Sequence, residues 1–434
     1  QIKQLNDRSK MYYTPNKENN VFQLVVQYGA GEREFPKLGY AAQLMNNAGI
    51  MGAYEPQELK EELSKLNATC HVTADDDNLY IIMEGYEAPL PQACQLLSRQ
   101  ILMPKLDEKQ LARLKGSAMG MRQQRKDNVS ILNEALRQYM LYGEKSDYIK
   151  ELTDKEIYEL QISELTGDIN RASNYEAKVF FTGTLPFDQV YDILSKNLPL
   201  VANERPSNSP QAKDMMPVTE NTVYFLPNND AEQAQIHLYI PMQKADKKDD
   251  VLRSAFNQYF GLDFTGIVLN EIREKRSMAY TAYAFVGTQG IAGKASYLRG
   301  YIGTQNDKAN DALDVLMGLV NDMPKNPERI DNIKSYLRQA MLTSHPSFRN
   351  KAMELVDLGY RGYTDDPAKE NLPKVDALTF DDIVKFYEEN IKDKPYCISI
   401  MGNPKNIDLK RLEKFGKVVK LNERKLFNTK DALF

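Results

Sequence analysis

The alternation of apolar and polar residues divides the first part of the chain into strands and helices. Strands are expected where apolar side chains recur at every second position, and helices where they recur every three or four residues. The predicted strands are 10–13, 21–28, 68–74, 78–84 and 178–183. The predicted helices are 36–48, 56–66, 90–103, 107–125, 129–141, 153–160 and 187–194.

The same order of elements returns after an irregular segment. Residues 202–214 mix Pro, Ser, Asn and Arg without periodicity, which is typical of a linker. Strands are then predicted at 222–226, 234–240, 280–286, 297–303 and 396–402, and helices at 249–259, around Arg273, and at 308–323 and 327–342. Pro104 corresponds to Pro324 and Gly183 to Gly402, so the repeat has an offset of roughly 220 residues.

This repetition predicts an α+β fold made of two tandem homologous units. Each unit is expected to contain an antiparallel sheet covered by helices on one face. The predicted division is a first unit at 1–201, a linker at 202–217 and a second unit at 218–434.

Composition and charge exclude some classes of function. With 42% hydrophobic and 27% charged residues, the chain is typical of a globular protein. Its net charge of -4 leaves no basic excess for binding nucleic acid. No run of apolar residues is long enough for a membrane span. Because the chain begins with Gln1, we expect a processed or excised piece, which is compatible with a periplasmic or secreted location and leaves the compartment open.

Candidate chemistry concentrates at one helix-to-strand junction. Residues 267–276 have helical spacing of apolar positions and end in a cluster of charges, and residues 280–286 alternate as a strand does. Arg273 and Tyr280 lie on either side of this junction, where a guanidinium and a phenol can converge. An arginine at a helix end is often only a solvated charge, and a tyrosine that opens a strand is often core or rim.

The duplicated unit and the string LNEIREKRSMAYTAYAFV in the second copy resemble the pitrilysin/insulinase family of inverted zinc metallopeptidases. The resemblance covers essentially the whole chain, and processing peptidases and respiratory core proteins share the architecture. The family motif in the second copy is an arginine followed seven positions later by a tyrosine. Arg273 and Tyr280 match this motif.

The zinc motif of the family is missing from the first copy. Catalytic copies carry His-x-x-Glu-His on the first long helix and a further carboxylate downstream. Here Tyr40, Gln43 and Leu44 occupy the motif positions, and residues 118–121 contain no carboxylate. The remaining histidines are far apart and are predicted to be packed or surface residues: His71, His237 and His345. We therefore expect no metal and no other cofactor in this chain, and zinc in a partner half.

The resemblance implies a division of labour in which this chain is the zinc-free half of a zinc metalloendopeptidase that hydrolyses peptides in a closed chamber. Tyr280 would donate its phenolic proton to the oxyanion, and Arg273 would hold a substrate carbonyl or support the phenol. The partner is expected to be a zinc-bearing half, in the same polypeptide or as a separate subunit, and the isolated chain is expected to be inactive. The alternative is a catalytically silent structural or peptide-binding subunit.

Two further expectations concern substrate and motion. Peptides in this family add to a sheet edge of the zinc-bearing domain, so the edge strands of the first copy are candidates for a secondary substrate contact. Closure of a chamber implies motion between the halves, with the linker as hinge or tether.

Overall fold

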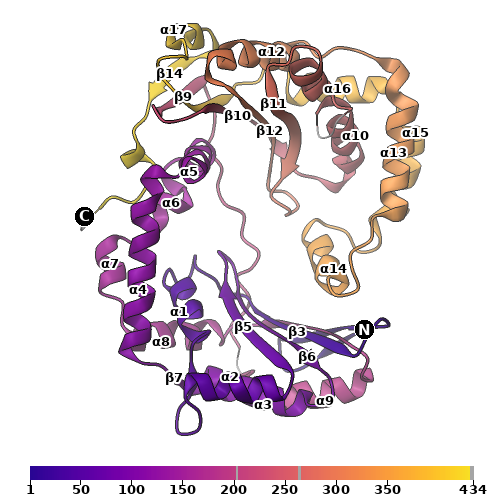
Figure 1. Ribbon diagram of the computed structural model, residues 1–434. Coiled ribbons are helices and arrows are strands. Elements are labelled where there is room, and N and C mark those ends of the chain that lie inside the picture. The colour runs from indigo at the N-terminus through magenta and orange to yellow at the C-terminus, as the bar shows by residue number, and fades with distance from the viewer. Residues whose placement is uncertain (202–203, 262–264, 431–434) are drawn as a thin grey trace.

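Two six-stranded sheets dominate the computed structural model, which describes residues 1–201, 204–261 and 265–430 (Figure 1). The first sheet has the spatial order β1 (Ile2–Gln4), β2 (Lys10–Pro15), β8 (Ala177–Gly183), β3 (Val21–Tyr28), β6 (Leu79–Tyr86) and β5 (Ala68–Ala74). The second has the order β14 (Lys417–Lys420), β9 (Thr222–Pro227), β13 (Cys397–Gly402), β10 (Gln233–Lys244), β12 (Ala295–Gln305) and β11 (Ala279–Thr288).

Five of the six positions in each sheet, from β2 to β5 in the first and from β9 to β11 in the second, are filled by corresponding successive strands of the two units, which confirms the predicted α+β fold of two repeated units. The outermost strand differs, because β1 comes from the start of the first unit and β14 from the end of the second. Most strand pairs are antiparallel, as predicted. The pairs β2–β8, β9–β13 and β9–β14 are parallel, so both sheets are mixed.

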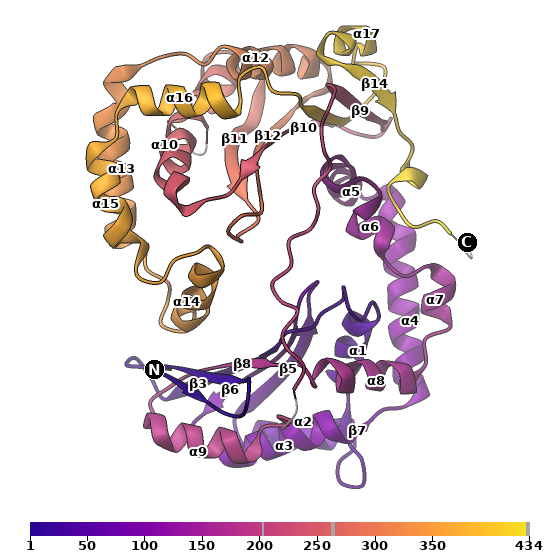
Figure 2. The same cartoon turned by 180° about the vertical axis from the view of Figure 1, so that it is seen from behind.

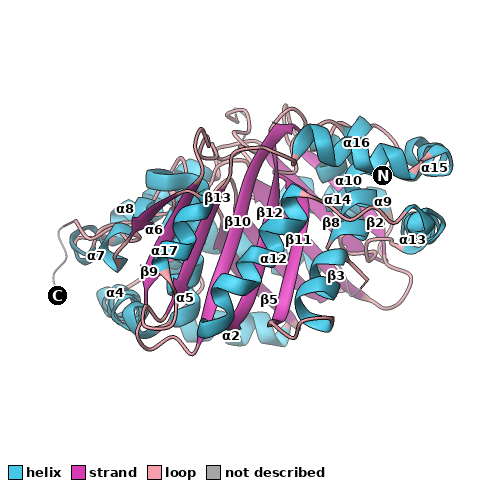
Figure 3. Cartoon of the chain, turned by 90° about the horizontal axis from the view of Figure 1, so that it is seen from above, coloured by secondary structure: helices cyan, strands magenta, loops and turns pink. Residues whose placement is uncertain are grey.

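Helices pack on the outer face of each sheet (Figures 1 and 3). The helices of the first unit are α1 (Leu38–Met45), α2 (Pro56–Lys65), α3 (Leu90–Leu102), α4 (Glu108–Gln123), α5 (Val129–Tyr142), α6 (Asp147–Lys150), α7 (Asp154–Tyr158), α8 (Ile162–Ala172) and α9 (Phe187–Asn197). Those of the second are α10 (Asp250–Phe260), α11 (Ile267–Leu269), α12 (Ala309–Asn321), α13 (Ile330–Thr343), α14 (Lys351–Tyr360), α15 (Pro367–Ala377), α16 (Phe380–Asn390) and α17 (Leu409–Leu412). Two short strands, β4 (Gly49–Ile50) and β7 (Pro104–Lys105), pair with each other.

Alternation along the strands decides which side chains enter the core. On β12, Leu298 and Ile302 are fully buried in the cluster that contains Leu316 of α12. Arg299 and Tyr301 alternate with them and therefore project from the opposite, inner face. The first unit follows the same rule on β3, where Leu24 and its alternate neighbours pack against the helices.

Helix α5 departs from the expectation of helices on one face only. It belongs to the first unit by sequence, yet Leu132 and Leu136 pack with Leu226 and Met401 on the inner face of the second sheet. The helix therefore joins the two units, as Figure 1 shows. The boundaries 1–201, 202–217 and 218–434 accordingly stay a prediction.

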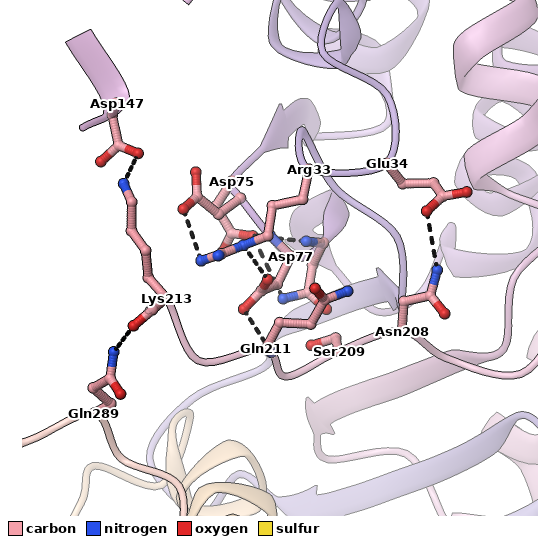
Figure 4. Close-up of polar contacts among 12 residues, drawn as sticks. Arg33, Glu34, Asp75, Asp77, Asp147, Asn208, Ser209, Gln211, Lys213 and Gln289 are labelled. Carbon is pink, nitrogen blue, oxygen red and sulfur yellow. Dashed lines mark hydrogen bonds and ion pairs between the residues drawn. The ribbon is translucent and has the colours of Figure 1, made fainter. Parts of the chain in front are cut away.

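The described part of the linker, residues 204–217, makes contacts with both units (Figures 2 and 4). The Asn208 amide donates to the Gly29 carbonyl at 2.7 Å, and Ser207 lies so close to Gly29 that a Cβ there would collide with it. Further on, Lys213 forms an ion pair with Asp147 of the first unit, and its carbonyl accepts a hydrogen bond from Gln289 of the second. The linker is therefore a strap that contacts both units.

In each sheet, an asparagine side chain hydrogen-bonds to the backbone of one valine on an edge strand, which is β5 in the first sheet and β11 in the second. Asn46, just after α1, donates to the Val72 carbonyl at 2.8 Å and accepts from the Val72 amide at 2.7 Å. Asn257 of α10 makes the same two bonds with Val286 on the edge strand β11, at 3.0 and 2.6 Å. The backbone amide and carbonyl of Val72 are therefore already hydrogen-bonded. A substrate strand that adds to this edge of the first unit would have to pair with other residues of β5.

Among the described residues, no helix has both the length and the apolar character that a membrane crossing requires.

Candidate functional site

The junction that carries Arg273 and Tyr280 is built from a short helix that changes its winding. Helix α11 runs into the π-helical segment η4 (Asn270–Glu274), and the buried side chains of Val268 and Ile272 hold both against the core. The chain then turns at Ser277, whose φ of 50° lies in the left-handed region. A π-helical turn of this kind is frequent at functional sites.

A β-bulge then redirects the first residues of β11. Ala279 pairs with Thr304 and Thr281 with Gly303, so Tyr280 is the extra residue between two paired ones. Bulges of this kind change the direction of a side chain and are frequent next to active sites. Here the bulge leaves the Tyr280 side chain projecting into solvent, with 78% of the residue exposed.

Arg273 and Tyr280 meet across the junction. The guanidinium carbon of Arg273 lies 5.2 Å from the centroid of the Tyr280 ring, within cation–π range. The nearest acidic contact of Arg273 is Glu274, with Nε and Oε1 3.5 Å apart. The structure therefore brings the two predicted residues together at an accessible surface, and their catalytic role remains a prediction.

The neighbouring charges are occupied with one another. Lys275 and Arg276 both form ion pairs with Glu271, and these hydrogen bonds lower the pKa of the Glu271 carboxyl. Lys275 and Arg276 are thus held by Glu271, and Arg273 is the cation within cation–π distance of the exposed phenol.

The positions of the missing zinc motif lie on α1 in the first unit. Leu44 is buried in the core, Gln43 is exposed, and Tyr40 is half-buried. Burial raises the pKa of the Tyr40 phenol, which keeps it neutral. Leucine has no ligand atom, and a glutamine amide is a poor base and a poor zinc ligand. The three side chains therefore do not fit a zinc ion.

Two arginines on and just after α4 lie near Tyr40 and are paired with carboxylates. Arg122 forms an ion pair with Asp154 at 2.7 Å, and Arg125 forms a bidentate pair with Glu151. Both guanidinium groups act electrostatically on the Tyr40 phenol. Both arginines are paired with carboxylates, so these acidic side chains near Tyr40 are already engaged in ion pairs.

The histidines do not assemble another metal site. His71 and His345 are exposed, and His237 is buried on the inner face of the second sheet with Nε2 3.0 Å from Oδ1 of Asn133. Burial, with Arg299 and Arg137 nearby, lowers the pKa of His237 to about 3, so this ring is neutral. In the described part of the chain, no group of three His, Cys, Asp or Glu side chains is arranged to hold a metal ion.

No pattern in the sequence indicated that the pKa of the Glu32 carboxyl is shifted. It lines a cavity of about 680 Å³ where the linker passes the first unit, together with Asp76, Asp147 and Lys213. Burial, followed by the charges of Asp76, Asp75 and Asp147, raises the pKa of Glu32 to about 7. These acidic residues come from separate segments of the chain, so only the fold could bring them together.

Comparison with known proteins gives a family match over part of the chain and a shared fold over most of it. Residues 173–337 match the family model described as the peptidase M16 inactive domain. No curated protein sequence matches the chain.

Solved structures share the fold over nearly the whole chain. A peptidase M16 inactive domain from Pseudomonas fluorescens is 17% identical with a TM-score of 0.72, and the match covers 94% of this chain and 98% of that one. The periplasmic protease PqqL from Escherichia coli is 12% identical with a TM-score of 0.69, covering 93% and 46%. The ferredoxin protease FusC, solved with Arabidopsis ferredoxin, is 12% identical with a TM-score of 0.71, covering 91% and 44%.

At these identities the structural likeness shows the fold, and this chain spans slightly less than half the length of either protease. The matched family segment ends in α13 and so includes both Arg273 and Tyr280. The chain is therefore similar to the peptidase M16 inactive domain over residues 173–337, and it shares the fold of M16 inactive-domain structures over nearly its whole length.

Proposed function

We propose that this chain is the zinc-free half of a zinc metalloendopeptidase and supplies Arg273 and Tyr280 to a site completed by a zinc-bearing half. The observation that carries the proposal is the contact of the two side chains, 5.2 Å apart, at an exposed bulge of the second unit. The missing ligands on α1 support the assignment of the metal to a partner.

The pair suits the stabilisation of a tetrahedral intermediate. When water adds to a peptide carbonyl, the oxygen becomes negatively charged, and the Tyr280 hydroxyl donates a hydrogen bond to it. The Arg273 guanidinium holds a neighbouring substrate carbonyl or keeps the phenol in place. Donors of this kind are worth a few kcal/mol when they are preorganised in a closed site. Water activation belongs to the partner half.

The partner is either the other half of a longer chain or a separate subunit. The first arrangement is supported by PqqL and FusC, each about twice as long as the part that this chain matches. The second is supported by the Pseudomonas fluorescens domain, which this chain covers almost completely.

Reconstitution tests the proposal. The isolated chain, analysed for metal by mass spectrometry, is expected to contain no zinc and to leave a quenched fluorescent peptide uncut. Addition of the zinc-bearing half is expected to restore cleavage. Peptidase activity of the metal-free chain alone would contradict the proposal, as would a partner half that is fully active without it.

The alternative is a catalytically silent structural or peptide-binding subunit, and the inactive-domain family match favours it as the second candidate. Exchange of Tyr280 for phenylalanine separates the two. An assembled complex whose turnover is unchanged by Tyr280→Phe assigns the chain to structure or peptide holding.

A further inference from the structure

The inner face of the second sheet is only half covered. Helix α5 packs over β9, β13 and part of β10. On the neighbouring strands, Tyr283, Phe285 and Tyr301 are only partly buried. The rings form a continuous aromatic surface, with centroids 6.0 Å apart for Tyr283 and Phe285 and 5.3 Å for Tyr283 and Tyr301.

A single cation lies within this aromatic surface. Arg299 on β12 pairs in register with Phe285 on one side and with Tyr239 on the other. The residue is half-buried, and its Nε is covered without a hydrogen-bond partner. Among the residues that the structure describes, Arg299 forms no ion pair or hydrogen bond, unlike Arg137 on α5, which is paired with Glu134.

An unpaired, partly desolvated guanidinium is unfavourable unless a ligand compensates it. The residues that face inward beside it on β10, β11 and β12 include no acidic side chain. Two further polar atoms on this face lack partners, Nδ1 of His237 and Oγ of Ser399, but both residues are fully buried on the strands that α5 covers. The unfilled capacity to bind a polar, negatively charged group therefore lies at Arg299, on the uncovered part of the face.

We propose that Arg299 and the aromatic surface of Tyr283, Phe285 and Tyr301 bind a carboxylate of an extended peptide. A guanidinium fork matches a carboxylate with two parallel hydrogen bonds, and the rings provide apolar contact for the residues next to it. The surface shares strand β11 with Tyr280, so a peptide held there lies along the strand that carries the candidate catalytic phenol.

The inference rests on the proposed function only in taking a peptide as the ligand, and peptide binding by the isolated chain tests it without the zinc-bearing half. Three fluorescein-labelled peptides share one apolar sequence. The first has a free terminal carboxylate and no acidic side chain, the second an amidated terminus and one glutamate, and the third an amidated terminus and no acid. Fluorescence anisotropy gives the dissociation constants.

The wild-type chain is expected to bind one or both acidic peptides about tenfold or more tightly than the neutral one. A preference for the first peptide assigns the terminal carboxylate, and a preference for the second assigns a side chain. Arg299→Gln is expected to remove the preference while leaving the affinity for the neutral peptide nearly unchanged. Arg411→Gln, which removes an exposed and paired arginine, is the matched control and is expected to keep it.

Equal affinity for all three peptides in the wild-type chain would overturn the proposal, as would a preference that survives Arg299→Gln. If circular dichroism shows that Arg299→Gln is unfolded, Arg299→Lys replaces it. That variant keeps the charge without the fork, and it is expected to lose part of the preference; an undiminished preference would count against the site. Reconstituted peptidase activity can succeed or fail independently of this result.

Discussion

Each unit places one helix against the other unit, and the two contacts differ in strength. Helix α5 of the first unit places Leu136 in a fully buried cluster with strands of the second sheet. Helix α14 of the second unit lies against β2 of the first and buries none of its residues. Its nearby contacts are an ion pair of Arg349 with Glu84 at 3.7 Å and the Lys178 ammonium 5.7 Å from the Tyr360 ring.

This difference indicates which of the two contacts between the units is the more stable. The α5 seam is the buried packing of α5 on the second sheet, and the α14 seam is the contact of α14 with β2. Burial of apolar side chains stabilises the α5 seam by several kcal/mol, whereas partly exposed ion pairs are worth about 0–1 kcal/mol each. The strap at 204–217 reinforces the α5 side, because Met216 bonds through its amide to Leu141 of α5 and through its carbonyl to Tyr239. Relative motion of the units is therefore expected to open the α14 side first.

The largest expected effect comes from breaking the α5 seam. Leu136→Ala leaves a cavity in a fully buried cluster and is expected to lower the free energy of unfolding by about 3 kcal/mol. Leu355→Ala on α14, where the leucine is 51% exposed, is the matched control and is expected to change it by less than about 0.5 kcal/mol. Urea unfolding followed by circular dichroism measures both. Equal losses would show that the two seams are equivalent.

A second prediction compares Tyr280 of the junction with Tyr40 of α1, which occupies the position of the missing first zinc ligand. In the reconstituted complex, Tyr280→Phe is expected to lower turnover about a hundredfold, because a donor to the oxyanion is lost. Tyr40→Phe removes a hydroxyl at the position of the missing zinc ligand and is expected to leave turnover unchanged. Steady-state kinetics with one fluorogenic peptide compares the variants. A large loss of turnover in Tyr40→Phe would contradict the comparison, because it would show that the first unit also contributes to catalysis.

The third prediction concerns what the units have in common, the carboxamide caps of β5 and β11. Asn46→Ala and Asn257→Ala each remove two hydrogen bonds from an edge valine and are each expected to cost about 2 kcal/mol. Hydrogen exchange at the Val72 and Val286 amides should rise in the respective variant. Asn47→Ala is the control, since its side chain makes only long contacts, 3.5 Å to the Gln43 carbonyl and 3.4 Å from the Lys60 ammonium, and neither involves an edge strand. Unchanged exchange would mean that the caps do not protect the edges.

The smallest expected effect is the pH dependence of Glu32. Its pKa is raised from 4.5 to about 7, so between these values the native carboxyl binds more protons than the unfolded one. Stability should therefore fall as the pH rises from about 4.5 through 7. Glu32→Gln should remove this loss and stabilise the chain by roughly 1 kcal/mol at pH 8, discounted for partial exposure, with little effect at pH 4. Thermal unfolding across this pH range measures the effect, and Glu18→Gln at an exposed position is the control. If Glu32→Gln and Glu18→Gln both behaved as wild type, the raised pKa of Glu32 would be contradicted.

Much of the local structure was predictable, because it depends on short-range periodicity. The strand at 21–28 is found as Val21–Tyr28 and the helix at 56–66 as Pro56–Lys65. The helix expected around Arg273 is shorter than predicted and partly π-helical. Ile272 is buried in the core within the π-helical segment, and the chain turns soon afterwards at Ser277. The parallel pairing of β2 with β8 was missed, because strands so distant in sequence pair by topology, which their own pattern does not reveal.

The sequence by itself determined the repeated α+β unit, the loss of zinc ligands at Tyr40, Gln43 and Leu44, and the spacing of Arg273 and Tyr280. These follow from the identity of single side chains and from periodicities within one element. Only the tertiary structure decided that the arginine and the tyrosine meet at a bulge, that α5 crosses to the other sheet, and that Arg299 lies unpaired among aromatic rings. Each of these three features depends on contacts between residues that are distant in the chain or on the register of paired strands. A local sequence pattern encodes neither distant contacts nor strand register.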